Sequence, residues 1–228
     1  HHIGCIIIFK NDDATYMMIA LSVFDNGIPG VLLNNEIIPT FFIFPTQPFI
    51  NGIFLKIINF FGFDINSYNY RILNIISFVG LIIVTSRVIN LLLKDHEYKY
   101  FLNSIFLILI SITPFSHNFY INRPEIMGLF FIFWALYFIF LPKKKGPSKE
   151  NDYIKISILL GLSFIMHPSC SLLSMAIYSV FLFNKLRDKN YKKIFMSIFF
   201  FILSISPLFI WIIINYDVAS DQLFNRIS

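Results

Sequence analysis

The sequence predicts an all-α fold, a polytopic bundle of transmembrane helices with further helices lying at the membrane surface. Two observations support this prediction. Of the 228 residues, 57% are hydrophobic and only 14% are charged, whereas an ordinary soluble domain carries about 25% charged residues. The apolar residues also recur in long runs, and about 20 such residues cross a hydrocarbon core of roughly 30 Å. We therefore expect these runs to lie in lipid.

The basic residues predict the orientation of the chain. Of the 18 Lys and Arg residues, 13 lie in three segments beside the ends of apolar runs, 87–99, 143–155 and 185–193. The positive-inside rule assigns these segments to the cytoplasm. We therefore expect a multi-pass protein of the cytoplasmic membrane with region 11–69 outside. No basic and aromatic platform lies outside the apolar runs, which argues against nucleic-acid binding.

Region 11–69 is predicted to be the first external loop. The short apolar stretch in residues 1–10 is interpreted as the end of a preceding membrane helix. Two interfacial helices are predicted inside the loop, at 14–24 and 48–63. The first is expected to end at Asn26-Gly27, and the second to begin at Pro48 after the extended segment FPTQP.

Four single spans are predicted after this loop, at 70–93, 100–120, 124–141 and 194–215. Pro114 interrupts the second of them and Pro207 interrupts the last. The stretch 153–183 is too long for one span, and both of its flanks are basic. The chain must then enter the membrane and return, so we predict two short helices of about 13 residues, each about 20 Å long, meeting at MHPS. A break at such depth is tolerated where it is buried in protein or lines a watery cavity.

The first candidate for chemistry is the acid pair Asp12-Asp13 at the start of the loop. One interpretation is structural, because an acid at the start of a helix caps it and interacts favourably with its dipole. In the other, Asp12 or Asp13 is a general base at the membrane surface, with Tyr16 on the same helical face. Two adjacent carboxylates also leave open a divalent cation, although no further ligands can be named.

The motif INRPE supplies a second candidate, at the external start of the span 124–141. A helix start explains Asn122 as its cap, Pro124 at its first position and Glu125 in its first turn. It does not explain Arg123, because the charge bias disfavours an external arginine. A guanidinium close to lipid headgroups is suited to a phosphate. Arg123, with Glu125 beside it, is therefore either a ligand contact or part of a structural ion pair.

Four further polar residues are weaker candidates. His167, at the predicted break, is either a packed, hydrogen-bonded histidine or a side chain that faces the same cavity as the acids. Gln47 in FPTQP either contacts a ligand or belongs to the scaffold. Arg71 lies at the start of one predicted span, and His117 lies near the external end of another.

The order of these features resembles that of the GT-C fold glycosyltransferases that use polyprenyl-phosphate sugars, the group of protein mannosyltransferases and aminoarabinose transferases. Asp12-Asp13 with Tyr16 is similar to the Asp-Glu pair and tyrosine of that family's first external loop. Three longer segments also resemble the family, PTQPFINGIFLKIINFFGFDINSYNYRILNIISFVGLIIV, SITPFSHNFYINRPEIMGLFFIFWALYFIF and LLGLSFIMHPSCSLL. Because the family is longer, the resemblance implies that residues 1–228 are a single transmembrane domain from the N-terminal part of such a protein.

This resemblance implies an inverting transfer of a sugar from a polyprenyl-phosphate donor to a lipid, glycan or protein acceptor on the extracytoplasmic face. Asp12 or Asp13 would accept the proton of the attacking group. Arg123, with Arg71 or His167, would neutralise the departing phosphate. The implied partners are the donor lipid, the acceptor and membrane lipids, and no cofactor is certain.

Two other functions fit part of the pattern. A transporter or polysaccharide-export component would use NDD and MHPS to line a permeation path, since broken helices are common in transporters. A polysaccharide polymerase or ligase would use the same lipid-phosphate substrate but would place its essential Arg and His in a large later loop. Most of the polar candidates lie at the external ends of the predicted spans, which favours the transferase.

Overall fold

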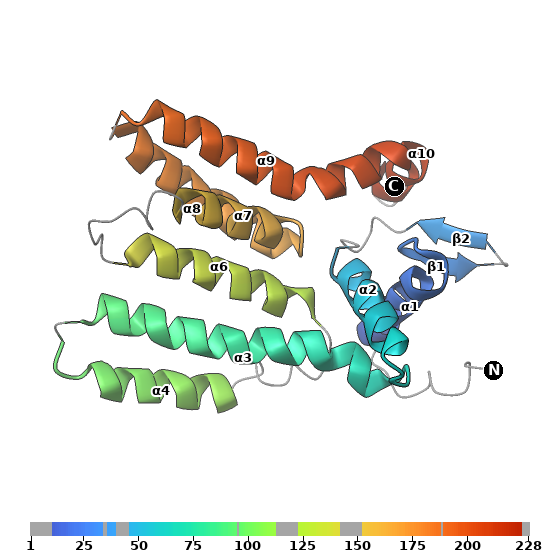
Figure 1. Ribbon diagram of the computed structural model, residues 1–228, viewed down its shortest axis with the longest axis horizontal. Coiled ribbons are helices and arrows are strands. Elements are labelled where there is room, and N and C mark those ends of the chain that lie inside the picture. Colours follow the sequence, from blue (N-terminus) through green and yellow to red (C-terminus); the bar gives the residue numbers. More distant parts are fainter. Residues whose placement is uncertain are drawn as a thin grey trace.

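The computed structural model describes residues 11–33, 36–39, 46–94, 96–112, 123–141, 152–187 and 189–224. Long helices run side by side in a layer, and a smaller unit lies at one end of it (Figure 1). The layer contains α3 (Ser67–Leu92), α4 (Lys99–Ile112), α6 (Pro124–Phe140), α7 (Asp152–Phe164), α8 (Pro168–Arg187) and α9 (Tyr191–Ile214). The smaller unit contains α1 (Asn11–Asn26), β1 (Gly30–Leu33), β2 (Glu36–Pro39) and α2 (Thr46–Phe60), and α10 (Tyr216–Phe224) lies at the same end.

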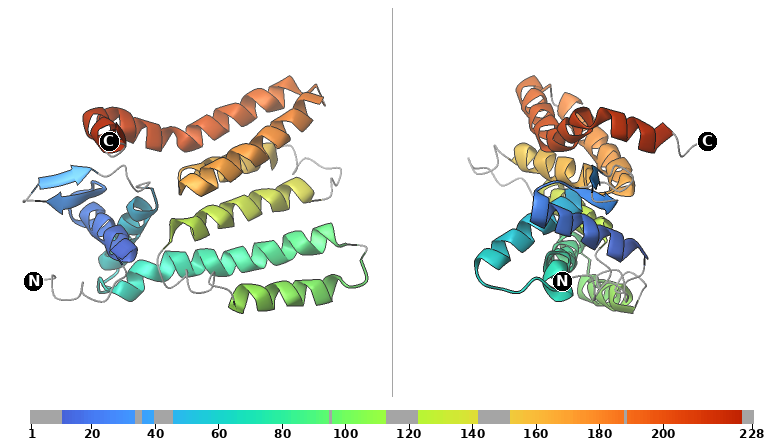
Figure 2. Two further views of the ribbon diagram at one scale, coloured as in Figure 1. Left: turned by 180° about the vertical axis from the view of Figure 1, so that it is seen from behind. Right: turned by 90° about the vertical axis from the view of Figure 1, so that its right-hand side faces the viewer.

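The helices of the layer pack in the order α4, α3, α6, α7, α9, with α8 against α7 (Figures 1 and 2). The core lies where α6, α7, α8 and α9 meet, and its buried residues include Ile132, Leu160, Tyr178 and Phe201. The rings of Tyr178 and Phe201 stack with their centroids 4.2 Å apart. Such aromatic pairs stabilise a core beyond the area that they bury.

Small side chains allow α7 and α9 to approach closely. A Cβ atom added at Gly161 of α7 would lie 2.6 Å from the Cβ of Ser204 on α9. One turn before Gly161, Ser157 shares a hydrogen bond with Ser197 of α9, and the hydroxyl of Tyr178 on α8 lies 3.1 Å from the Ser197 hydroxyl. Close packing and interhelical hydrogen bonds hold helices together in lipid, and here they link three helices.

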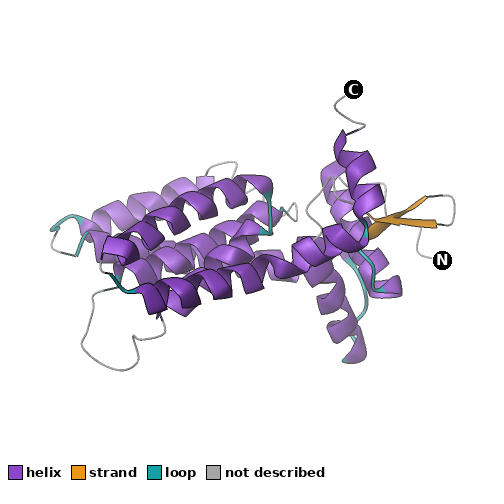
Figure 3. Cartoon of the chain, turned by 90° about the horizontal axis from the view of Figure 1, so that it is seen from above, coloured by secondary structure: helices purple, strands orange, loops and turns teal. Residues whose placement is uncertain are grey.

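The helices α1 and α2 form a pair that crosses the end of the layer at a steep angle to its long helices (Figure 3). They meet at Gly52, where an added Cβ atom would lie 2.5 Å from the Cβ of Val23. Tyr16, Leu55 and Tyr70 belong to one buried cluster that joins α1, α2 and α3. The pair is therefore packed onto the layer through the start of α3.

The described residues are almost all helical, as predicted, and a two-stranded antiparallel sheet after α1 is the exception. The strands β1 and β2 pair from Gly30–Pro39 to Leu33–Glu36. Neither strand shows the run of alternating apolar and polar residues that would predict it. Gly27 follows α1 at the predicted end of the first interfacial helix, with φ +78°, and Gly62 follows α2 with φ +83°. Glycine adopts such values without steric cost.

The starts of α2 and α6 differ from the prediction at residues that were candidates for the site or for the cap. α2 begins at Thr46 with Pro48 as its third residue, so FPTQP is not extended over its whole length. A proline is tolerated there because the first turn of a helix leaves its N–H groups without intrahelical partners. At α6, Arg123 occupies the N-cap position without a side-chain cap bond and Pro124 follows it, so the cap is not Asn122, which lies outside the described residues.

Within the described part, three helices are long and apolar enough to cross a membrane: α3, α8 and α9. Large apolar side chains stand exposed along them, among them Phe195, Ile202 and Ile213 of α9. Exposure of this extent is unfavourable in water and is expected of helices that face lipid. α6 has 17 residues, and the described part of the predicted span 100–120 is the 14-residue α4.

The predicted break in 153–183 is present, but one predicted helix length was wrong. α7 ends at Phe164 and α8 begins at Pro168, with Ile165 and Met166 of the turn buried in protein. α7 has 13 residues as expected, whereas α8 has 20 and continues through Arg187. Lys185 and Arg187 lie in its last turn, where cations interact favourably with the helix dipole. α10 was not predicted.

The alternating directions of the helices separate their connections into two groups (Figure 1). The α3–α4 connection and the α8–α9 turn lie at one end of the layer, and both contain basic residues, Lys94 and Lys99 in one and Lys189 in the other. The start of α6 and the α7–α8 turn lie at the opposite end, beside α1 and α2. This is the arrangement that the predicted topology requires.

Candidate functional site

The candidate site lies at the end of the layer that carries α1 and α2. There the start of α6 comes next to the α7–α8 turn, and the end of α9 reaches the smaller unit (Figures 1 and 2). Arg123 and Glu125, which lie close together in the sequence, meet there with His167, which lies far from them in the chain. We define them as the REH cluster.

Glu125 is the centre of the REH cluster. Its Oε1 atom lies 3.7 Å from Nη1 of Arg123 and 3.4 Å from Nε2 of His167. Each of the three side chains is about one quarter to one third exposed, so the cluster is open to a ligand from one side. Oε2 of Glu125 is buried and has no hydrogen-bond partner among the described residues, which leaves it an acceptor for a further donor.

The environment of His167 fixes its tautomer. Nδ1 lies 2.8 Å from the hydroxyl of Ser169 and 3.4 Å from the amide nitrogen of Ser169. The amide group can only donate, so Nδ1 acts as the acceptor and the proton of the neutral ring lies on Nε2. That N–H group faces the Glu125 carboxylate. The imidazole is therefore a donor toward the cluster in both its neutral and its charged form.

Contacts between the start of α6 and the start of α8 hold Glu125 and His167 next to each other. The Sγ atom of Cys170 donates a hydrogen bond to the carbonyl oxygen of Glu125 at 3.8 Å. A Cβ atom at Gly128 would lie only 2.6 Å from Sγ of Cys170. The first turn of α8 thus packs against the first turns of α6, and any larger residue at Gly128 would force His167 away from Glu125.

No match is found when the chain is compared with protein-family models, curated proteins and solved structures. Among the described residues, no group of three or more His, Cys, Asp and Glu side chains is arranged to hold a metal ion.

The acid pair lies in the same region. Asp12 and Asp13 are in the first turn of α1, and their side chains lie outside the described part of the structure. Tyr16, one turn further, is 5% exposed and packs with Ala20, Leu55 and Tyr70. The ring of Tyr16 is therefore a packing element of the junction of α1, α2 and α3, in addition to any contact of its hydroxyl.

The other predicted residues differ in accessibility. Gln47 is completely buried in the first turn of α2. Arg71 is half-buried in the second turn of α3, beside the buried Tyr70. His117 lies outside the described residues. Of the two described residues, Arg71 is the one whose side chain is partly open to solvent.

Sequence reasoning missed a set of buried polar side chains at the junction of α1, α2 and α3. Asn51 and Asn74 are completely buried, and both carboxamide atoms of Asn51 have no hydrogen-bond partner in the described part of the chain. Asn51 follows Gln47, and Asn74 follows Tyr70, by four residues. This spacing puts each pair on one helical face, but the sequence does not show that this face is buried.

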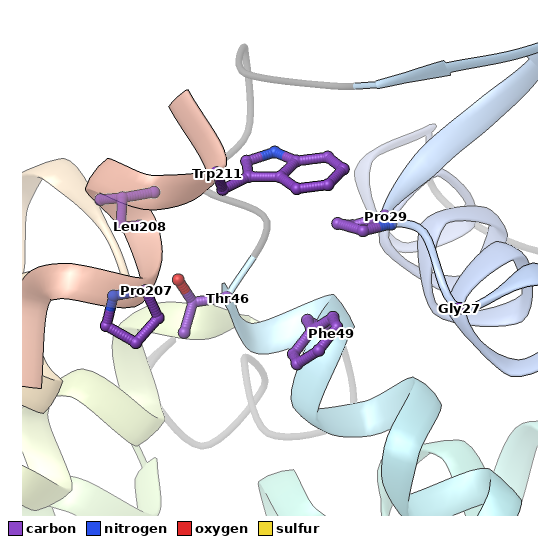
Figure 4. A pocket seen from close by; sticks show the side chains of 7 residues that line it. All are labelled: Gly27, Pro29, Thr46, Phe49, Pro207, Leu208 and Trp211. Atoms are coloured by element: carbon purple, nitrogen blue, oxygen red, sulfur yellow. The ribbon is translucent and has the colours of Figure 1, made fainter. Parts of the chain in front are cut away.

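A pocket of about 160 Å³ lies at the same end of the layer. Gly27 and Pro29 after α1, Thr46 and Phe49 at the start of α2, and Pro207, Leu208 and Trp211 of α9 line it (Figure 4). Its walls are largely apolar, and the Trp211 indole lies opposite Phe49 across the space. Sequence analysis noted Pro207 only as an interruption of a span, since the pocket depends on contact between segments far apart in the chain.

Proposed function

We propose that this chain transfers a sugar from a polyprenyl-phosphate donor to an acceptor at the end of the bundle that carries α1, α2 and the REH cluster. One observation carries the proposal. A half-buried arginine, carboxylate and imidazole meet beside a pair of crosswise helices, at the end of a layer of apolar helices. A donor with a hydrocarbon tail, a phosphate and a sugar requires such a boundary between apolar and polar surroundings.

The REH cluster supplies the groups that a phosphate requires. The Arg123 guanidinium donates paired hydrogen bonds of the kind that phosphate oxygens accept. The Nε2–H group of His167 is a second donor. Glu125 contacts both side chains through Oε1 and so holds them on one side of the site. Two donors fixed in place before the reaction stabilise the charge that develops on a departing phosphate.

The transfer step needs a base and no strong acid. A hydroxyl or amine of the acceptor attacks the anomeric carbon, and its proton passes to the carboxylate of Asp12 or Asp13. The bond between the anomeric carbon and the phosphate oxygen breaks, and its electron pair leaves with the polyprenyl phosphate. Attack opposite the leaving group inverts the anomeric centre. Arg71, half-buried near the same junction, would contact the donor or acceptor, whereas the fully buried Gln47 would support the junction from within.

The apolar features of this end suit the rest of the donor. The largely apolar pocket between α2 and α9 offers room for isoprene units close to the phosphate. α2 presents the exposed side chains Phe49, Ile53, Ile57 and Phe60. A helix with such a surface is stable at the boundary of headgroups and acyl chains. The proposed site faces the extracytoplasmic side, opposite the basic turns.

The test is sugar transfer by the chain, within its full-length protein, in proteoliposomes that contain a panel of polyprenyl-phosphate sugars. Asp12→Asn and Asp13→Asn are compared with Asp25→Asn, a matched control because Asp25 is exposed in the last turn of the same helix. We expect one of the first two variants to lose turnover by about 100-fold or more with donor binding retained. The control should keep its activity.

Two results would reject this proposal. Equal transfer by all three variants would make the acid pair a helix cap. No transfer by the wild type across the panel, together with uptake of a solute into the vesicles, would favour a transporter in which the α7–α8 break lines a path.

A further inference from the structure

The turn between α8 and α9, at the end of the layer away from the candidate site, carries an unusual concentration of positive charge. Residues 184–193 read NKLRDKNYKK, with five basic residues and one acid. The basic residues are Lys185, Arg187, Lys189, Lys192 and Lys193. We define them as the cationic turn.

Hydrogen bonds give the cationic turn a defined shape. The amide of Lys189 donates to the carbonyl oxygen of Leu186 at 2.9 Å, and the amide of Asn190 donates to that of Lys185 at 3.4 Å. This pair of bonds is the Schellman arrangement that ends a helix. The side chain of Asn190 then accepts from the amide of Lys193 and caps α9. The charges are therefore held on two helix ends joined by a short, hydrogen-bonded connection.

Lys189 occupies the position where the Schellman arrangement favours glycine. Its φ of +54° is the only positive value among the described residues other than glycine. A side chain is disfavoured in this conformation by its Cβ atom, so glycine would stabilise the turn more than lysine does. A lysine at a position where glycine fits better indicates that the positive charge has a function.

The surroundings of the cationic turn are apolar and face outward. Both α8 and α9 are long and apolar enough to cross a membrane, so the turn that joins them would lie at a membrane surface. Phe183, Leu186, Tyr191 and Phe195 are all exposed within two turns of it. The ammonium group of Lys185 lies 5.6 Å from the ring centre of Phe181. One surface thus offers aromatic and aliphatic contacts for acyl chains and positive charges at the headgroup level.

We propose that the cationic turn is a binding site for anionic phospholipids, which it selects over zwitterionic ones by their net negative headgroup. Basic residues next to membrane helices attract anionic lipids, and each contributes about a fivefold factor in affinity near the surface. The site is independent of the proposed sugar transfer, because it lies at the opposite end of the layer and shares no residue with the REH cluster.

The test is native mass spectrometry of the full chain in detergent, titrated with phosphatidylglycerol or phosphatidylcholine. The variants are Lys189→Gly, the double variant Lys192→Gln/Lys193→Gln, and the control Lys56→Gln on α2 at the other end. We expect phosphatidylglycerol to bind about fivefold more weakly to Lys189→Gly and roughly 25-fold more weakly to the double variant. Binding to Lys56→Gln should match the wild type.

The glycine variant separates a lost charge from a damaged fold. Its thermal midpoint in neutral detergent should equal or exceed that of the wild type, because the strained φ is relieved. A lower midpoint would show that Lys189 stabilises the turn. It would overturn the inference that lysine stands at this glycine-favouring position because of its charge. Equal affinity of the wild type for both lipids, or an equal loss in Lys56→Gln and the double variant, would overturn the binding site itself.

Discussion

The imidazole of His167 and the carboxylate of Glu125 face each other across 3.4 Å, one in the turn before α8 and the other in the first turn of α6. The contact joins the turn between α7 and α8 to the start of α6. Because Nδ1 of His167 is occupied by Ser169, the ring has one orientation in which Nε2 meets Glu125. The pair is thus a structural link between α6 and α8, in addition to its proposed contact with a ligand.

The strength of this link is measurable with Glu125→Gln, His167→Ala and the double variant. Both side chains are about one quarter exposed, so we expect solvent to screen them and the coupling to be about 0.2–1 kcal/mol. Unfolding of the wild type and the three variants in mixed micelles gives the four free energies of unfolding that a double-mutant cycle requires. A coupling well above this range would show that the contact is less hydrated than its exposure indicates.

Gly161→Ala should destabilise the layer by about 1–3 kcal/mol, because the new methyl group meets the Cβ of Ser204 at 2.6 Å and the carbonyl oxygen of Phe201 at 3.1 Å. Alanine is the better helix former, so a loss of stability must come from the α7–α9 contact. Ser179→Ala, on an exposed face of α8, is the control. Equal unfolding midpoints for both variants and the wild type would mean that α7 and α9 are further apart than described.

Ser197→Ala should cost about 0.6–1.7 kcal/mol. The substitution removes the hydroxyl that Ser157 and Tyr178 both contact, while Ser157 keeps its bond to the carbonyl oxygen of Tyr153. Ser206→Ala is the matched control, since that hydroxyl bonds only locally, to the carbonyl oxygen of Leu203. Unfolding in mixed micelles measures both, and a cost no greater than that of the control would show that the three helices are not coupled through Ser197.

Gly52→Ala should loosen α1 from α2 and leave the layer intact. The added methyl group would lie 2.5 Å from the Cβ of Val23 and 2.6 Å from the carbonyl oxygen of Ala20. Hydrogen exchange should rise in α1 and α2 but not in α7 or α9. The control is Ile53→Ala, at an exposed neighbouring position. Faster exchange throughout the chain would show that the smaller unit and the layer unfold together.

Much of the fold followed from local signals in the sequence. The ends of α1 and α2 are marked by glycines whose positive φ other residues avoid. The break before α8 is marked by His167-Pro168 between two basic flanks. The length of α8 was wrong because Lys185 and Arg187 were assigned to a loop, although cations in a last helical turn are favourable and their long side chains reach the polar boundary.

The candidate site was predictable only in part. Arg123 and Glu125 are separated by one residue, so their proximity follows from the sequence. The approach of His167 depends on the packing of Gly128 against Cys170, which no local pattern reports. The burial of Asn51 and Asn74, and the pocket at Trp211, likewise depend on contacts between helices that only the folded chain provides.

Because α7 is short, the stability of the native chain should depend on the thickness of the bilayer around it. Its 13 residues measure about 20 Å, roughly 10 Å less than an average hydrocarbon core. Ile165 and Met166 at its end are buried in protein, so neighbouring helices cover most of the mismatch. Where α7 is partly exposed, the lipid must thin locally, at a cost that grows with acyl-chain length. Short-chain lipids should therefore stabilise the native chain more than long-chain lipids with the same headgroup.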